Sequence, residues 1–466
     1  MLVSVLLLGI LLAANCYRAA TQSITHDEAL TWQFYLAGPT ENIFNHYDPN
    51  HHFLATLLFR LSTSLFGHSE LSLRLPVLLA GALYFYSAFR LSRRQFGETL
   101  WLPVSVGLLC AHPLMLDFFV AARGYGLATA FLLWALSHAC DLENPRSVIK
   151  AAAGLSLAVA ANLTLLYPAA IMAGLVFYHL PRAPQQPVKK KQKRAPAGIA
   201  PRWRFAAVIA AFAALYLLTA PVHLIGREHL YAGADSLTTS LRGLAGLSFA
   251  YNDGPGSMLA AGGIRAMLLP VLAFLLPAVP AAALYFAAKL HDSCLLLVAG
   301  SAAGSGLLLI LSHLLTGMPY PGDRTGLYFY PLTTLCFLIL VHRLPKPFIA
   351  LPALAGLIFL LQWNTSSFRV WRYDADNKII LSRLEQLAAS SNLPISLGVS
   401  WLLEPAFNYY RYVNNYAWMP PLTRAGADGD YQFYVLTRND YEVLERRKLR
   451  VLYRGEISGV VLAAPP

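Results

Sequence analysis

The sequence predicts an all-α polytopic membrane protein that carries a small α/β domain at its C-terminus. Of its 466 residues, 56% are hydrophobic and only 13% are charged, whereas soluble domains carry about 25% charged residues. Apolar runs of about 20 residues, the length of a bilayer span, recur from Met1 to about Trp363. Beyond Trp363 they give way to short segments with alternating helix-like and strand-like periodicity. We therefore predict a membrane domain over 1–363 and an α/β domain over 364–466.

Window length and loop charge divide the membrane domain into about eleven predicted spans. The first span has no basic residue before it, so we interpret it as an uncleaved span rather than a signal peptide. The apolar stretch 52–66 is short and amphipathic, and we expect a helix lying in the membrane interface there. The predicted spans lie near 1–17, 71–90, 99–116, 124–140, 149–163, 165–181, 205–222, 263–288, 293–315, 326–342 and 348–363.

The distribution of basic residues predicts the orientation. The loop 181–204 is rich in lysine and arginine, and the loops of the same parity are basic too. Because positive residues stay on the cytoplasmic side, we expect the N-terminus inside and the tail outside. This is the arrangement of a multi-pass protein of a bacterial inner membrane with a periplasmic tail. The net charge of +12 concentrates in short loops between apolar runs, so it does not indicate a nucleic-acid partner.

Segments with helical periodicity alternate along the tail with segments that have the period of a β-strand. Its predicted helices are 379–389, 403–412 and 440–448, and its predicted strands are 394–399, 431–437, 450–453 and 459–462. It contains no glycine-rich phosphate loop, so we expect it to shape acceptor access rather than carry out chemistry. Candidate surface residues, with a hydrophobic core as the alternative for most of the aromatic ones, are Trp401, Glu404, Tyr409, Tyr410 and Tyr416.

The cysteines match no metal-binding spacing, and each lies in or beside an apolar run. We therefore expect small core residues and predict no disulfide framework. The five are Cys16, Cys110, Cys140, Cys294 and Cys336.

Chemistry is predicted in the long first outer loop, 18–70, which opens with the adjacent acids Asp27 and Glu28. Carboxylates just outside a span are tolerated in a working cavity, where one can accept the proton of an attacking hydroxyl. The alternative is a solvated loop start or a helix cap. Farther along, His51 and His52 are candidates for binding phosphate, a metal or an acceptor, with a plain surface pair as the alternative.

An ordered set of motifs resembles the GT-C glycosyltransferases of the protein O-mannosyltransferase and aminoarabinose-transferase type, and above all their prokaryotic relatives with an Rgt-like domain. The resemblance is clear over 20–180, weakens through the later spans and does not reach the tail. The motifs are Asp27-Glu28, Asn50-His51-His52, Phe66-Gly67-His68-Ser69-Glu70 with Arg74-Leu75-Pro76, Ala122-Arg123-Gly124-Tyr125-Gly126-Leu127, and Gly322-Asp323-Arg324.

The resemblance implies an enzyme that moves a sugar from a polyprenyl-phosphate donor to an extracytoplasmic acceptor (a glycolipid, polysaccharide or protein), with inversion at the anomeric carbon. Asp27 matches the catalytic base, and Glu28 matches the neighbour that orients it. Donor-phosphate ligands are then Arg123, Tyr125, Arg324 and Arg74. Residues that contact substrate or support the site are Asn50, His51, His52 and Asp117.

Some alternatives remain open at the level of the sequence. Arg123 with Tyr125 is also an interfacial anchor pair, Asp117 can pair with Arg123, and Asp323 with Arg324. The chain lacks the β-trefoil insertion of eukaryotic members and has no lysine in the outer loops of its membrane domain. No cofactor is certain, the metal ligands are unknown, and a divalent cation stays open. A transporter or flippase of a lipid-linked or anionic substrate is the main rival function, although it favours charges near mid-membrane and repeated halves.

The orientation is testable with reporter fusions. We expect a periplasmic reporter to be active when fused at Ala464 and a cytoplasmic one when inserted in the loop 181–204, because lysine and arginine stay inside. An active cytoplasmic reporter at Ala464 would reverse the topology.

Overall fold

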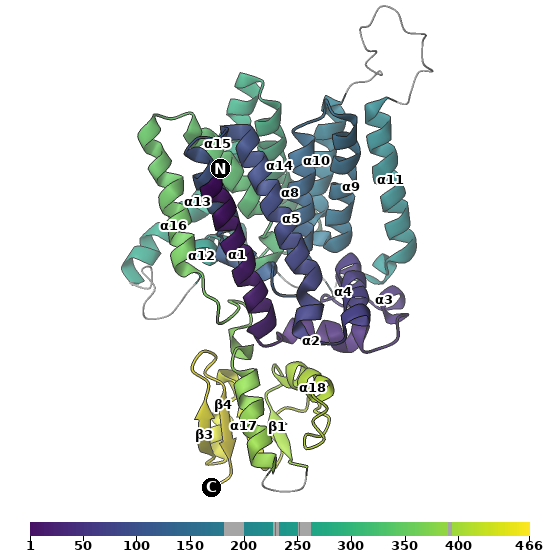
Figure 1. Cartoon of the computed structure of the whole chain (residues 1–466), viewed down its shortest axis with the longest axis vertical. Coiled ribbons are helices and arrows are strands. Elements are labelled where there is room, and N and C mark those ends of the chain that lie inside the picture. Colours follow the sequence, from purple (N-terminus) through teal and green to yellow (C-terminus); the bar gives the residue numbers. More distant parts are fainter. Residues whose placement is uncertain (181–199, 227–228, 230–232, 250, 252–261, 390–393) are drawn as a thin grey trace, which may run out of the picture.

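A computed structural model of the chain describes residues 1–180, 200–226, 229, 233–249, 251, 262–389 and 394–466. A bundle of helices forms most of the molecule, and the α/β tail lies at one end of it (Figure 1). The N-terminus lies toward the opposite end, and α1 runs from there toward the tail (Figure 1). Most of the basic loop that predicts the orientation, 181–199, is outside the described residues.

Every predicted span falls on a helix of the bundle. These helices are α1 (Leu2–Thr21), α5 (Glu70–Phe96), α6 (Trp101–Cys110), α7 (Pro113–Phe118), α8 (Gly124–Ala139), α9 (Pro145–Ala161), α10 (Leu166–His179), α11 (Pro201–Thr219), α13 (Gly262–Leu290), α14 (Ser293–Thr316), α15 (Phe329–His342) and α16 (Ala350–Gln362). A further helix, α12 (Leu237–Phe249), lies outside the predicted spans.

Among the described helices, five are long and apolar enough to cross a membrane: α1, α5, α11, α14 and the Met267–Leu290 part of α13. The count of about eleven spans is therefore not confirmed. The predicted span 99–116 illustrates the difference, because it divides into α6 and α7 at His112. Pro113 has no N–H to continue the first helix, and it begins the second one.

The first outer loop is folded into short helices at the tail end of the bundle (Figure 1). The loop contains α2 (His26–Thr31), a π-helix (Trp32–Leu36), α3 (Asn42–Asn45) and α4 (Phe53–Phe66). The helix predicted over 52–66 is thus present as α4. Its position relative to a membrane stays a prediction.

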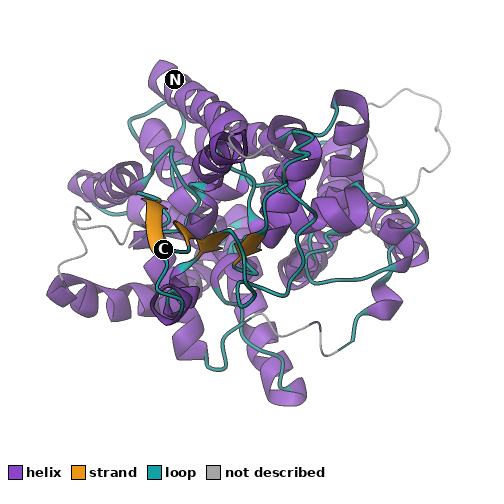
Figure 2. Cartoon of the chain, turned by 90° about the horizontal axis from the view of Figure 1, so that it is seen from below, coloured by secondary structure: helices purple, strands orange, loops and turns teal. Residues whose placement is uncertain are grey.

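The tail has the predicted alternation of helices and strands. Its sheet has the order β1-β2-β4-β3, in which β1 and β2 are parallel and the other two pairs antiparallel. Viewed from below, the strands lie near the middle of the helical bundle (Figure 2). The elements are α17 (Asn377–Ala389), β1 (Leu397–Val399), α18 (Glu404–Val413), β2 (Phe433–Leu436), α19 (Glu442–Arg446), β3 (Arg450–Arg454) and β4 (Val461–Ala464).

One hydrophobic cluster runs from the bundle into the tail. Its members include Leu73 of α5 and Phe119 beyond α7, and also Ile380 of α17 and Leu397 of β1. Burial of this shared apolar surface holds the tail against the bundle. The boundary between 363 and 364 stays a prediction.

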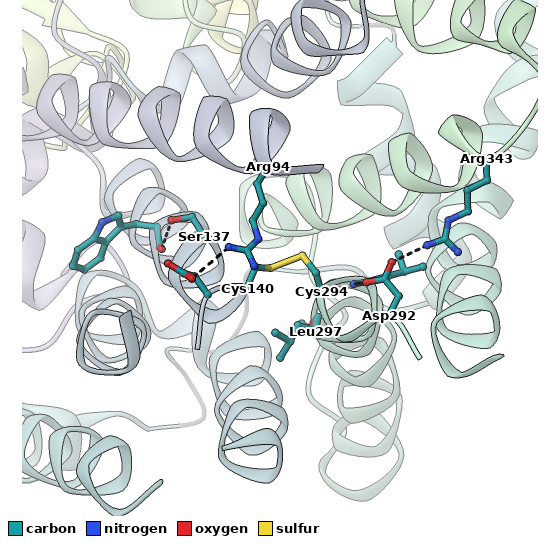
Figure 3. The surroundings of a disulfide bond; sticks show 11 residues. Arg94, Ser137, Cys140, Asp292, Cys294, Leu297 and Arg343 are labelled. Atoms are coloured by element: carbon teal, nitrogen blue, oxygen red, sulfur yellow. Dashed lines mark hydrogen bonds and ion pairs between the residues drawn. A yellow bond between two sulfur atoms is a disulfide. The ribbon is translucent and has the colours of Figure 1, made fainter. Parts of the chain in front are cut away.

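The absence of disulfides was predicted incorrectly. Cys140, after α8, and Cys294, in α14, form a disulfide (Figure 3). The two cysteines are 154 residues apart, so only helix packing brings them together. Arg94 and Arg343 lie near the bridge, and Arg343 pairs with Asp292 at 2.7 Å (Figure 3).

The disulfide lies at the end of the bundle away from the tail. Glu70, at the start of α5, contacts the tail through Lys378 at 2.8 Å, while Arg94 is near the other end of this 27-residue helix, roughly 40 Å away. The predicted orientation assigns that end to the cytoplasm, where structural disulfides are rare. The bridge and the charge bias therefore favour opposite orientations, between which the reporter fusions decide.

Candidate active site

The acid pair lies in the first turn of α2, whose start is fixed by a capping box. The Thr25 side chain accepts a hydrogen bond from the Glu28 amide at 3.2 Å, and the Glu28 carboxylate accepts one from the Thr25 amide at 2.9 Å. The T-x-x-E spacing is the sequence signature of this cap. The helix-cap alternative therefore holds for Glu28.

Glu28 also forms a buried ion pair with Arg74 of α5. Arg74 donates from Nε to one carboxylate oxygen at 2.9 Å and from Nη2 to the other at 2.7 Å, and both side chains are 0% exposed. The Ala122 amide donates to the same carboxylate at 2.6 Å. Burial alone would raise the pKa of Glu28, but the charge and hydrogen bonds of Arg74 outweigh it and lower that pKa.

Arg74 is not placed to bind a donor phosphate. Its remaining guanidinium hydrogens go to the backbone oxygens of Ala19, Gln22 and Ser23 at 2.8–3.1 Å. All of its donors thus serve the protein. Sequence alone assigned Arg74 to the donor, and the contacts instead make it the anchor of the first loop on α5.

Asp27, one residue before Glu28, points toward two other arginines. Its Oδ2 lies 3.3 Å from Nη2 of Arg324 and 3.8 Å from Nη2 of Arg123. Within the described residues this Oδ2 atom accepts no hydrogen bond, while Trp371 interacts with the carboxyl group. Burial would raise the pKa of Asp27, but Arg123 and Arg324 lower it, so the group is a carboxylate at neutral pH.

The two arginines differ in how fully the protein occupies them. Arg123 is 1% exposed and donates to Asn50 Oδ1 at 2.8 Å and to Thr31 Oγ1 at 3.0 Å. Arg324 is 28% exposed and lies over the ring of Trp371, 5.7 Å from its centroid. Of the two, Arg324 is the more accessible to an incoming anion.

The glycines that follow Arg123 are required by close approach. A Cβ at Gly124 would lie 2.2 Å from the Ala161 oxygen and 2.6 Å from the His52 Cβ, and one at Gly126 would lie 2.0 Å from the Phe118 oxygen. The start of α8 therefore packs directly against the His51–His52 segment. This explains the R-G-Y-G motif physically.

His51 and His52 are buried rather than a surface pair. His51 stacks on Tyr35 with ring centroids 4.4 Å apart, and His52 meets the edge of Tyr125 at 5.0 Å. Burial lowers the pKa of His51 to about 4 and that of His52 well below its usual value, so both are neutral. In the described part of the chain, no three His, Cys, Asp or Glu residues come together to hold a metal.

A largely apolar cavity of about 340 Å³ opens beside this cluster. His51, His52 and Tyr125 line it, whereas Asp27 and the two arginines do not. Tyr125 joins the two regions, because it also hydrogen-bonds Arg324. The cavity is also lined by Tyr167, Tyr216, Leu309 and Tyr328.

Asp117 lies in a separate buried network. It pairs with Arg18 at 2.5 Å and accepts hydrogen bonds from the Tyr251 hydroxyl at 2.5 Å and the Arg369 amide at 2.9 Å. The proposed pairing of Asp117 with Arg123 is therefore wrong. The partners are 99 or more residues away in sequence, and nothing local indicates them.

Sequence reasoning also missed three residues at the start of the tail. Trp371 lies against Arg324, and Asp374 accepts a hydrogen bond from the His26 amide at 2.8 Å. Burial raises the pKa of the Tyr373 hydroxyl, and Tyr373 lies close enough to Asp27 for the charge of that carboxylate to raise this pKa further. The only available signal was the cluster of aromatic and acidic residues directly after the last apolar run.

The Glu28–Arg74 pair generates a stability prediction. Glu28→Gln leaves a buried unpaired guanidinium, so we expect a loss of about 3–5 kcal/mol in the free energy of unfolding. Thermal melting in detergent measures it. Glu98→Gln is the matched control, because it opens the exposed Arg93–Glu98 pair and should change stability by less than about 1 kcal/mol. Wild-type melting of Glu28→Gln would contradict the anchoring role.

Comparisons with known proteins agree with this architecture. Residues 50–191 match the dolichyl-phosphate-mannose-protein mannosyltransferase family. The match covers the segment from Asn50 to Tyr125 of the site and excludes Asp27, Glu28 and Arg324. No curated protein sequence matches the chain significantly.

The fold is similar to that of ArnT from Cupriavidus metallidurans. The crystal structure of ArnT in the apo state gives a TM-score of 0.51 at 12% identity, covering 99% of this chain and 97% of that chain. ArnT bound to undecaprenyl phosphate gives 0.48 at the same identity and coverage. The similarity to apo ArnT extends into the tail, which the motifs did not reach. Residues 50–191 thus resemble the dolichyl-phosphate-mannose-protein mannosyltransferase family, and the fold of the chain is similar to that of apo ArnT.

Proposed function

We propose that the chain is a membrane glycosyltransferase that moves a sugar from a polyprenyl-phosphate donor to an acceptor outside the cytoplasm. The observation that carries this proposal is the Asp27 carboxylate held between two guanidinium groups, next to an apolar cavity. The family that matches 50–191 is named for a lipid-phosphate sugar, dolichyl-phosphate-mannose. A carboxylate base, cationic groups and an apolar chamber are what transfer from such a donor requires.

The donor is bound by two kinds of surface. The apolar cavity takes the first isoprene units, since burial of hydrocarbon is favourable there. Arg324 takes the phosphate, because its guanidinium is partly exposed and can bind phosphate oxygens in a bidentate manner. Arg123 adds its charge from a buried, hydrogen-bonded position. Both stabilise the charge that grows on the leaving phosphate as the glycosidic bond breaks.

The acceptor is activated by Asp27. Its carboxylate takes the proton of an acceptor hydroxyl while the hydroxyl oxygen bonds to the anomeric carbon. The bond from that carbon to the phosphate oxygen breaks, and its electron pair leaves with the lipid phosphate. One displacement of this kind inverts the anomeric configuration.

Donor binding also strengthens the base. In the absence of donor, Arg324 pairs with Asp27 and contributes to the low pKa of that carboxyl. A phosphate that draws the guanidinium away removes part of this effect, so the pKa of Asp27 rises toward its ordinary range. The carboxylate then accepts a proton more readily.

The orientation predicted from the charges agrees with this assignment. The site lies at the tail end of the bundle, which the charges assign to the periplasmic side of a bacterial inner membrane. The acceptor is then a periplasmic glycolipid, polysaccharide or protein.

Asp27→Asn tests the proposed base. The variant keeps the size of the side chain and removes its basicity, so turnover should fall about 10²–10⁴-fold while donor binding survives. The measurement is transfer from a panel of polyprenyl-phosphate sugars in liposomes. Glu41→Gln, an exposed acid of the same loop, is the control and should keep full activity. Normal turnover by Asp27→Asn would remove the base from this loop.

Arg324→Ala tests whether Arg324 binds the donor phosphate and whether it lowers the pKa of Asp27. We expect weaker donor binding and partial recovery with Arg324→Lys. Removing this cation should also raise the pKa of Asp27, because burial then acts against less opposing charge. Since the base works deprotonated, activity should be lost at a higher pH in the variant than in the wild type as the pH falls.

The control for Arg324→Ala is Arg242→Ala, an exposed arginine of α12. If Arg324→Ala loses activity at the same acidic pH as the wild type and binds the donor equally well, Arg324 lies outside the site.

A further inference from the structure

Trp401 and Tyr412 are both exposed aromatic side chains of the tail, but Tyr412 packs against the ring of Trp32 with centroids 5.0 Å apart. Of the candidate surface residues, Glu404, Tyr409 and Tyr410 are buried, whereas Trp401 is 47% exposed. Of the eight tryptophans, the only other exposed one is Trp203, at the start of the membrane-spanning helix α11, where interfacial tryptophans are common. Trp401 lies on the tail, where that explanation does not apply.

The loop that carries Trp401 is fixed directly to the catalytic helix. Nδ1 of His26 lies 2.6 Å from the Leu402 oxygen, and the His26 ring meets Trp401 edge-on with centroids 5.8 Å apart. His26 is the residue before Asp27, so the exposed indole contacts the neighbour in sequence of the proposed base. The loop also follows the carboxyl end of β1, a parallel strand, and such ends are where α/β sheets bind ligands.

Polar groups border the indole. The Arg424 guanidinium, 51% exposed, lies over the Trp401 ring, 5.8 Å from its centroid, and 3.5 Å from the Glu404 carboxylate. Asn408 donates a hydrogen bond to Glu404 and helps to hold it. An apolar ring face bordered by charged hydrogen-bonding groups matches a sugar ring, which has C–H faces and hydroxyl edges.

We infer that Trp401, with Arg424 beside it, binds a saccharide acceptor and presents its hydroxyl to Asp27. This inference rests on the proposed function and names the class of its acceptor. A peptide that adds a strand to the sheet fits less well, because β1 has only three residues. The acceptor is thus a glycan or the glycan part of a glycolipid.

Binding of the full chain in nanodiscs to arrayed glycans tests the inference, with arrayed peptides and protein-free vesicles as the competing ligands. We expect the wild type to bind a class of glycans and Trp401→Ala to weaken that binding about tenfold or more. Trp401→Phe should retain part of the binding, and Arg424→Ala should weaken it less. Trp203→Ala is the matched control and should bind glycans like the wild type.

Glycan binding unchanged by Trp401→Ala, or no binding to any glycan, overturns the inference. Selective binding of peptides, or Trp401-dependent binding of vesicles, overturns it too. Melting temperatures verify that the variants are folded, and Trp401→Phe serves if Trp401→Ala is not. Asp27→Asn should retain glycan binding, since this readout needs no turnover. If glycan binding depends on Trp401 but no sugar is transferred from any lipid donor, only the proposed function is wrong. If sugar transfer occurs and does not depend on Trp401, only the inference is wrong.

Discussion

The buried pair of Glu28 and Arg74 is the interaction on which the rest of the site depends. Both side chains are completely buried, so each charge is tolerable only because the other is present. Through it, α2 is tied to α5 and to the amide of Ala122, immediately before Arg123. The position of Asp27 follows, because Asp27 lies in the same turn of α2 as Glu28.

A second buried pair extends this framework to the tail. Arg18 and Asp117 join α1 to α7, and Phe368 lies between Arg18 and Arg74, 5.2 Å and 5.4 Å from their guanidinium carbons. The residues that follow Phe368 include Trp371, which packs against Arg324. The start of the tail is therefore part of the wall of the site. A tail without catalytic motifs of its own thus contributes a side chain to the candidate site.

Some charged groups of the candidate site are held by hydrogen bonds within the protein, and others are accessible to a ligand. Arg74 donates all its hydrogens to protein oxygens, and Arg123 is buried among Asn50 and Thr31. Asp27 and Arg324 instead face each other at 3.3 Å, where Arg324 is 28% exposed and Asp27 Oδ2 accepts no hydrogen bond within the described residues. Preorganised but unsatisfied charges of this kind can act on a substrate without first breaking strong contacts within the protein.

The sequence by itself determined most of the helical and strand segments, including their order in the tail, because these follow from periodicity within a few residues. It also determined the capping box at Thr25, which is equally local, whereas the need for glycine at 124 comes from the tertiary contacts with Ala161 and His52. Only the tertiary structure decided which acid is anchored and which is available, which arginine is accessible, and that Cys140 meets Cys294. Those outcomes depend on contacts between residues tens to hundreds of positions apart, for which a single sequence carries no local signal.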